Sequence, residues 1–135
     1  MYWKYFASWI PGIPIAIANG ILRNSLYRRF LPELPAHQLS AVSFIAFFGL
    51  YVWLILKWLK LCSSRDALRL ASTWLLLTVA FEFLFGHFVM GNPWEALLHD
   101  YNLMAGRVWV LVLTWIAVAP IIFHRIQRTR SLSAA

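Results

Sequence analysis

Four apolar runs of nearly bilayer length dominate this sequence. They cover residues 5–22, 39–56, 68–90 and 105–123. About 20 helical residues cross the hydrocarbon core of a bilayer, and none of these runs shows the strict alternation of strands in a membrane barrel. The sequence therefore predicts an all-α integral membrane protein, with a four-transmembrane-helix bundle that forms a single membrane domain over residues 1–135.

The composition leaves no room for a soluble domain beside the four spans. Hydrophobic residues make up 61% of the chain and charged residues 13%, whereas soluble domains carry about 25% charged residues. The formal net charge of +7 comes from short basic clusters beside apolar runs, which is typical of orientation in a membrane. We expect the lipid bilayer as a partner and no nucleic acid. The single cysteine, Cys62, excludes an internal disulfide and a cysteine-based zinc site.

The first run is the least regular of the four. Pro11, Gly12 and Pro14 lie inside it, and proline removes a backbone donor and clashes with the preceding turn. We expect a kinked span that stays in the protein. The alternative is a cleaved signal peptide, because Lys4 precedes the run and residues 16–18 resemble a cleavage pattern of small residues.

The connections between the spans differ in character. Residues 31–35 contain two prolines and predict an extended connection, because proline disfavours helix at the residue before it. Ser63 or Ser64 is the expected N-cap of the third span. After Asn92, residues 96–103 have apolar positions at helical spacing and predict a short amphipathic helix in the membrane interface between spans 3 and 4.

The basic residues predict the orientation of the spans, because Lys and Arg accumulate on the cytoplasmic side. With alternating connections, both termini are cytoplasmic and the first and third connections lie outside, as in a multi-pass protein of a bacterial inner (plasma) membrane. The predicted inner side holds Lys4, Lys57, Lys60, Arg65, Arg69, Arg125, Arg128 and Arg130, and the outer side holds Arg23, Arg28, Arg29 and Arg107.

Glu82 is the most informative residue of the chain. It lies within an apolar stretch of the third span, where a carboxylate is costly unless it is paired, protonated or in contact with water. Thr78 and Gly86 share its helix face. The first span has a comparable stripe that ends in Asn19 and Arg23, so the leading predicted contact is an Arg23–Glu82 ion pair. Arg107, at the start of the fourth span, is the competing or third member of this contact.

We expect a buried polar site in the outer half of the bilayer that binds or transports a small ion, a proton or an anionic group. The alternative is that these side chains only hold the helices together. The candidate binding residues are Asn19, Arg23, Glu82, His87, Asn102 and Arg107.

The acids and histidines around the third connection raise the question of a metal. Their spacing matches no ordered ligand motif, so we expect no metal and no cofactor. The side chains that would be ligands if a metal did bind are His87, Glu95, His99 and Asp100.

Three motifs resemble a pattern found in uncharacterised small four-span bacterial inner-membrane proteins. They are ANGxxR at 18–23, FEFxFGH at 81–87 and DYNxxxGRxW at 100–109. The resemblance implies residence in a bacterial membrane and implies no activity.

Three functions remain open from the sequence. Binding or transport comes first, with a homo-oligomer as the conducting form, because four helices make a narrow pathway. A non-enzymatic accessory or assembly subunit of a larger membrane complex is the alternative. A membrane enzyme acting on a lipid or quinone head group comes third. The sequence has no nucleophile motif or phosphate-binding loop that would support catalysis.

Overall fold

A computed structural model of the chain describes residues 2–99, 101–102, 104 and 109–134. Helices form almost all of this described part, and no strand occurs in it. Two of the helical segments, η1 and η2, are single π-helical turns. The elements are α1 (Tyr2–Trp9), α2 (Gly12–Leu22), η1 (Arg23–Tyr27), α3 (Arg28–Phe30), α4 (Glu33–Leu59), α5 (Ser64–Leu84), η2 (Phe85–Val89), α6 (Trp94–His99) and α7 (Trp109–Ala134).

Four helical stretches among the described residues are long and apolar enough to cross a membrane. They are Tyr2–Phe30, Glu33–Leu59, Ser64–Val89 and Trp109–Ala134. Each contains most of one apolar run, so the prediction of four apolar helices of membrane-crossing length is confirmed. The first, second and fourth helices extend well beyond the apolar runs, because helical hydrogen bonding continues into the polar flanks.

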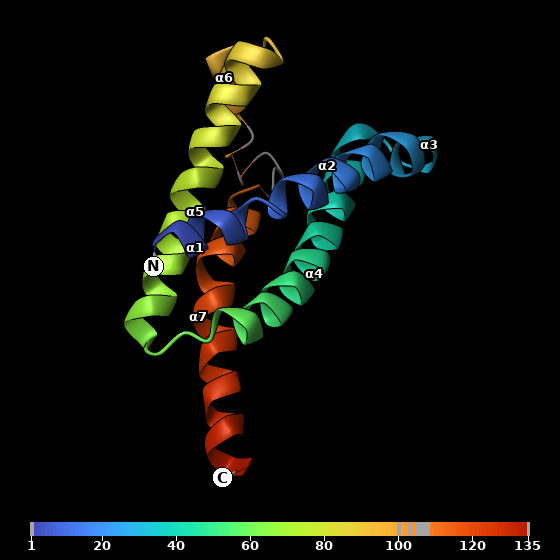
Figure 1. The fold of residues 1–135 in the computed structure, drawn as a ribbon. Helices are drawn as coiled ribbons and strands as arrows, with labels where there is room; N and C mark the ends of the chain where they lie inside the picture. Colours follow the sequence, from blue (N-terminus) through green and yellow to red (C-terminus); the bar gives the residue numbers. More distant parts are fainter. Residues whose placement is uncertain (1, 100, 103, 105–108, 135) are drawn as a thin grey trace.

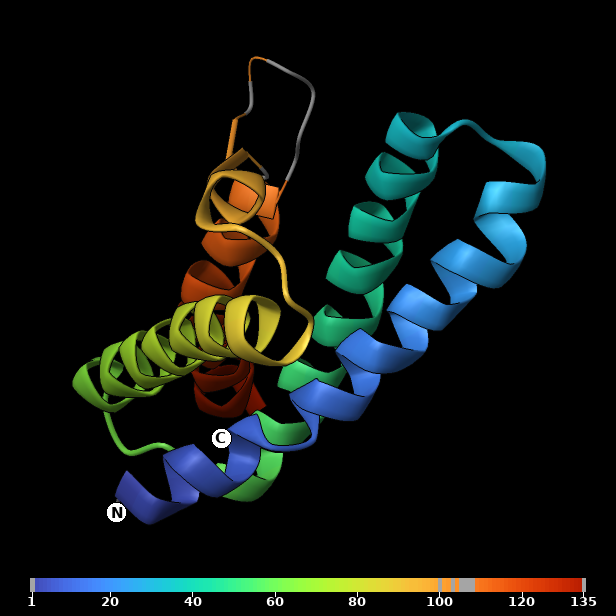
Figure 2. The ribbon, with the colours of Figure 1, turned by 90° about the horizontal axis from the view of Figure 1, so that it is seen from above.

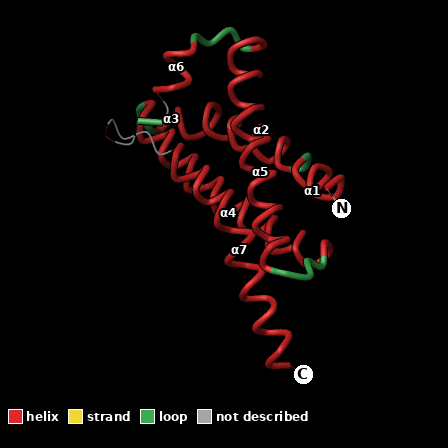
Figure 3. The backbone as a smooth tube through the Cα atoms, turned by 90° about the vertical axis from the view of Figure 1, so that its left-hand side faces the viewer, coloured by secondary structure: helices red, strands yellow, loops and turns green. Residues whose placement is uncertain are grey.

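The four stretches form two antiparallel pairs that cross steeply. The chain runs through α1, α2 and α3 and returns along α4, and α5 and α7 lie side by side as the second pair (Figures 1 and 2). The lower part of α4 packs against α7, and α1 packs against α5. The turn before α4 and helix α6 lie toward one end of the molecule, and the 60–63 loop and the C-terminal end of α7 lie toward the other (Figures 1 and 3).

The first stretch is broken where the prolines predict a kink. Helix α1 ends at Trp9, and α2 begins at Gly12 after a turn at Ile10 and Pro11. The break lets α1 pack against α5 while α2 packs against α4. The predicted kink is therefore confirmed, and it directs the two halves of this stretch to different partners.

The extended connection predicted at 31–35 is wrong in its second half. Leu31 is extended, but α4 already begins at Glu33, and Pro35 lies in its first turn. Proline is tolerated there, because the first N–H groups of a helix have no intrahelical acceptor. The early start of α4 places Glu33 and His37 on a helix rather than in a loop.

Two further predicted boundaries have different outcomes. Ser63 is the N-cap of α5, and its hydroxyl accepts a hydrogen bond from the Asp66 N–H at 3.2 Å, which confirms the predicted cap. The amphipathic helix expected at 96–103 is instead the six-residue helix Trp94–His99. Its first turn is closed by N–H groups that donate to the Pro93 carbonyl, so this helix begins earlier than the apolar spacing indicates.

The core lies where the four stretches meet, toward the 60–63 loop. Trp74 of α5 is completely buried, and its Nε1 donates hydrogen bonds to the Tyr5 carbonyl at 3.0 Å and to Ser8 Oγ at 3.3 Å. Tyr5, Val52 and Leu70 are also almost fully buried. We call this cluster the packed region. It joins α1, α4, α5 and α7 and leaves the opposite end of the molecule less tightly filled.

Candidate functional site

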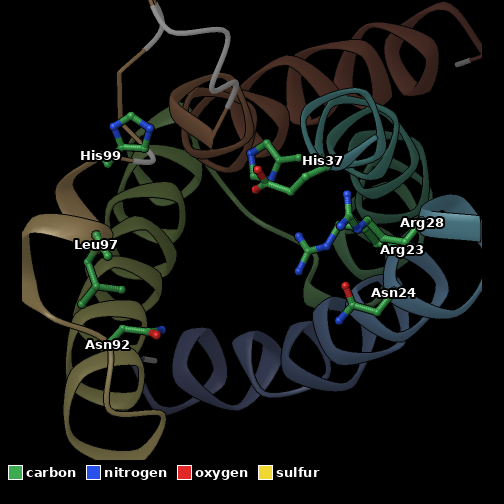
Figure 4. A pocket seen from close by; sticks show the side chains of 9 residues that line it. Arg23, Asn24, Arg28, His37, Asn92, Leu97 and His99 are labelled. Atoms are coloured by element: carbon green, nitrogen blue, oxygen red, sulfur yellow. The ribbon is translucent and has the colours of Figure 1, made fainter. Parts of the chain in front are cut away.

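The end of the molecule opposite the packed region contains a polar cavity of about 450 Å³. Arg23 and Arg28 extend toward its interior from the first stretch, and His37 faces it from α4 (Figure 4). The segment around α6 forms the opposite wall. The lining residues are Arg23, Asn24, Arg28, Glu33, His37, Asn92, Ala96, Leu97 and His99.

A π-helical turn brings the two arginines together. The Arg28 N–H donates to the Arg23 carbonyl, five residues back. In a regular α-helix, residues five apart are separated by about 140° around the axis, so they would face different surroundings. The wider turn stacks Arg28 one turn after Arg23, and both side chains line the same cavity. Such turns are frequent at functional sites.

The two guanidinium groups share the polar cavity with one carboxylate, that of Glu33. Neither Arg23 nor Arg28 forms an ion pair with a described residue. Asp66 and Arg69 form an ion pair, but they lie near the other end of the molecule. Guanidinium offers five N–H donors and keeps its charge at any physiological pH. The polar cavity therefore has two guanidinium groups against one carboxylate on its walls, with space for a guest.

Asn19 is buried next to this cavity, but not in the role that the sequence predicts. Its Nδ2 donates to the Ser40 carbonyl at 2.9 Å and to Ser40 Oγ at 2.8 Å. The side chain is 7% exposed, and its Oδ1 has no hydrogen-bond partner. Asn19 thus links α2 to α4 rather than supporting an Arg23–Glu82 pair.

Glu82 has different partners from the predicted one. Its Oε2 accepts hydrogen bonds from the Tyr101 hydroxyl at 2.7 Å and from Trp109 Nε1 at 2.8 Å. Arg23 makes no ion pair with Glu82, so the leading predicted contact is wrong. The reason is geometric: the first stretch crosses α5 near α1, and at the level of Glu82 a cavity separates the two helices.

That second cavity, of about 300 Å³, is mostly apolar. Gly12 and Ala16 from the first stretch line it on one side, and Thr78 and Glu82 of α5 and Gly86 of η2 line it on the other. The two stripes of small and polar residues therefore do face each other, as the helical spacing predicts. They border a cavity instead of packing together, and the Trp9 indole bridges them by donating to Thr78 Oγ1 at 3.0 Å.

The remaining candidate residues lie apart from the two cavities or outside the described residues. His87 stacks on the Trp94 ring with centroids 3.7 Å apart, and its Nδ1 lies 2.9 Å from the Asn92 carbonyl oxygen. Asn102 is exposed, and its N–H donates to the His99 carbonyl. Arg107 lies outside the described residues.

The candidate metal ligands do not gather in the described part of the chain. His99 lines the polar cavity, whereas His87 stacks on Trp94 and Glu95 is exposed on α6. Asp100 lies outside the described residues. Among the residues that the structure places, no group of three His, Cys, Asp or Glu side chains could hold a metal ion.

Several residues that line the polar cavity are not among the candidate site residues that the sequence predicts. Arg28 enters the sequence argument only through the orientation of the spans, and Asn92 only through its place before the short helix. Asn24, Glu33 and His37 were not singled out either, because a connection was expected between the first two spans. The one available signal was the pair of cations at positions 23 and 28 beside an apolar run.

Comparisons of the chain with models of protein families, with curated proteins and with solved structures found no match.

Proposed function

We propose that this chain is a multi-pass integral membrane protein that binds an anionic group in the polar cavity. Its surface supports the membrane environment, because large apolar side chains stay exposed along the helices. Leu50, Leu76 and Phe88 are each at least 60% exposed. Soluble monomers rarely expose extended apolar surface, whereas lipid covers it favourably.

The orientation proposed from the sequence places the polar cavity on the outer side of a bacterial inner membrane, with both termini in the cytoplasm. Lys57, Lys60 and Arg65 lie around the 60–63 loop, at the end opposite the cavity. This distribution follows the usual excess of cations on the cytoplasmic side. With this orientation, α6 lies at the outer interface.

The observation that carries the proposal is the stacking of Arg23 and Arg28 on one cavity wall. Charge-assisted hydrogen bonds from guanidinium to carboxylate or phosphate are roughly twice as strong as neutral ones. Two like charges on one turn also repel each other, and a bound anion relieves this repulsion. The polar cavity is large enough for a guest, because ligand pockets are typically about 300–1,000 Å³.

The geometry supports binding by a single chain rather than passage through it. The packed region, with Trp74, Tyr5 and Val52 almost fully buried, lies between the cavities and the opposite end of the molecule. An anion that enters the polar cavity therefore meets close-packed apolar side chains. Transport would need an oligomer or a second arrangement of the helices, so binding is the function we propose.

The test is anion binding by the purified full chain in nanodiscs of phosphatidylcholine. We expect saturable binding of a soluble phosphate monoester, butyl phosphate, that weakens by about tenfold or more in Arg23→Gln and in Arg28→Gln. Arg29→Gln is the matched control, because Arg29 is adjacent, carries the same charge and does not line the cavity.

Equal weakening in all three variants would show that only the overall charge matters and would overturn the proposed site. Absence of saturable binding by the unchanged protein would overturn the proposed function and favour an accessory role in a larger membrane complex.

A further inference from the structure

The polar cavity is one of three adjoining cavities. It shares Asn92 and Leu97 with the apolar cavity described above. A smaller cavity of about 140 Å³, which we call the connecting cavity, shares Arg23 and His37 with the polar one. The connecting cavity shares further lining residues with the apolar one, namely Ala16, Phe44 and Trp109. The three cavities therefore adjoin one another between the two helix pairs, and we call the set of three the recess.

The chemistry of this recess changes sharply along its length. At the arginine end, the walls carry two guanidinium groups, two histidines and the Glu33 carboxylate. At the other end, the walls are mainly aromatic and aliphatic, with Phe44, Phe48 and Ile116 among them. A guest that fits both ends must itself have an ionic end and an apolar end.

The apolar end is not sealed from the outside of the protein. Phe81 and Phe85 line it and are 37% and 41% exposed, and their rings stack with centroids 5.1 Å apart. These side chains belong to the face of α5 and η2 that contacts lipid under the proposed function. An apolar guest can thus enter from the bilayer without crossing water.

Two polar groups at the recess favour one direction of binding. Glu82 lines the apolar cavity, whereas in the polar cavity Arg23 and Arg28 outnumber the single carboxylate of Glu33, so the negative end of a guest is favoured beside the arginines. Asn19 Oδ1 lies where the connecting cavity begins, buried and without a hydrogen-bond partner. A buried amide oxygen without a donor is costly, and a hydroxyl of a guest's head group would satisfy it.

We infer that the anionic group bound by this protein is the head group of a membrane amphiphile, with a phosphate-type head beside Arg23 and Arg28 and an apolar chain in the apolar cavity. This inference rests on the proposed function and names the class of its ligand. The anionic head of such a ligand accounts for the arginines of the polar cavity, and its apolar chain accounts for the walls of the apolar cavity.

The experiment compares two probes that share a head group and differ in chain length. Dodecyl phosphate and butyl phosphate are titrated into the full chain in phosphatidylcholine nanodiscs. Gly12→Leu places a larger side chain in the apolar cavity, since a Cβ at this position points toward Phe48 at 3.8 Å. Ala80→Leu is the matched control, because Ala80 is exposed on α5 and lines none of the three cavities.

We expect Gly12→Leu to weaken dodecyl phosphate binding by about tenfold or more, as overfilled sites do, and to leave butyl phosphate binding unchanged. Ala80→Leu leaves both unchanged. Partition of the long chain into the nanodisc is the same for every variant, so it cancels in this comparison. Retained binding of butyl phosphate shows in the same sample that the variant is folded, and Ala16→Leu repeats the test from a second position.

The outcomes separate the inference from the function on which it rests. If Gly12→Leu and Ala16→Leu leave dodecyl phosphate binding unchanged, the chain does not occupy the apolar cavity; the inference then fails, while arginine-dependent binding of butyl phosphate still supports the proposed function. If neither probe binds saturably, both fail. Binding of dodecyltrimethylammonium as tightly as dodecyl phosphate would also overturn the inference, because the arginines would then not select the head group.

Discussion

The packed region and the recess are built from the same four helical stretches, yet they are filled in opposite ways. Around Trp74, the side chains of regular α-helices pack closely together, and Val52 and Leu70 are completely buried. Around Arg23 and Glu82, two π-helical turns interrupt the helices, and three cavities adjoin. Both regions are rich in aromatic residues, so composition does not separate them.

The crossing of the helix pairs explains this difference. Where the pairs cross, helices from both lie close enough for side chains to interlock, and close packing gives most of the stability of a helical core. Beyond the crossing the pairs diverge (Figure 2), and the side chains leave three cavities between them. One end of the molecule can therefore serve stability while the other serves binding, and this division is open to test by mutation.

The largest effect is expected in the packed region. Trp74→Ala removes a completely buried indole and its hydrogen bonds to Tyr5 and Ser8. Large-to-small changes of this kind cost about 3–5 kcal/mol, measured as the free energy of unfolding in detergent by circular dichroism. Leu76→Ala is the control on the same helix, because Leu76 is 70% exposed. Equal losses in the two variants would mean that the region around Trp74 is not the core.

Glu82 gives the next effect, at the recess. Glu82→Leu leaves the Tyr101 hydroxyl and Trp109 Nε1 without this acceptor, and an unsatisfied buried donor costs about 1–3 kcal/mol. We expect a loss of about 2 kcal/mol in the unfolding free energy, with Glu82→Gln restoring most of it through its amide oxygen. If Glu82→Gln is as destabilising as Glu82→Leu, the negative charge of Glu82 rather than its hydrogen bonds stabilises this part of the fold.

A pair of glycine substitutions distinguishes the two regions by the sign of the effect. In Gly49→Ala, the new Cβ comes within 3.0 Å of the Trp115 ring, and overpacking costs about 1–3 kcal/mol. In Gly20→Ala, the Cβ meets nothing within 4 Å, so alanine stabilises the helix by about 0.5–1 kcal/mol. Thermal unfolding of both variants checks this prediction, and a destabilising Gly20→Ala would contradict the open geometry beside the connecting cavity.

The smallest destabilisation concerns the buried link between the first two stretches. Asn19→Ala removes two hydrogen bonds to Ser40 but also removes the buried Oδ1 that has no partner. A net loss of about 1 kcal/mol in unfolding free energy is expected. Asn24→Ala, an exposed change on the same stretch, is the control with no expected loss. A loss of several kcal/mol at Asn19 would show that this link is part of the core.

Much of the fold follows from local sequence signals. The apolar runs predict the four helices, Pro11 predicts the break between α1 and α2, and Ser63 predicts the start of α5. The predicted start of α4 is wrong, because a proline is compatible both with the first turn of a helix and with an extended connection. The sequence alone does not distinguish these two possibilities at Pro35.

The candidate site was predicted less well. Helical spacing singles out Arg23 and the small faces around Gly12 and Glu82, and these residues line two of the cavities. The hydrogen-bond partners of Glu82 are not predicted, because the spacing of residues gives the face of a helix on which a side chain lies and not the side chains that lie opposite that face. The position of Arg28 at the polar cavity is also not predicted, since regular α-helical geometry directs its side chain away from that of Arg23. Only the π-helical turn places the two side chains on the same side.

The sequence by itself determined how many helices form and which residues are scarce enough to be conspicuous, because helix length and polarity are matched locally to the environment that each run must occupy. Only the tertiary structure decided that Arg23 and Arg28 share a cavity, that Glu82 bonds to Tyr101 and Trp109, and that a recess connects them. These features depend on where the helix pairs cross and how far they diverge, and that geometry is set by all four stretches together.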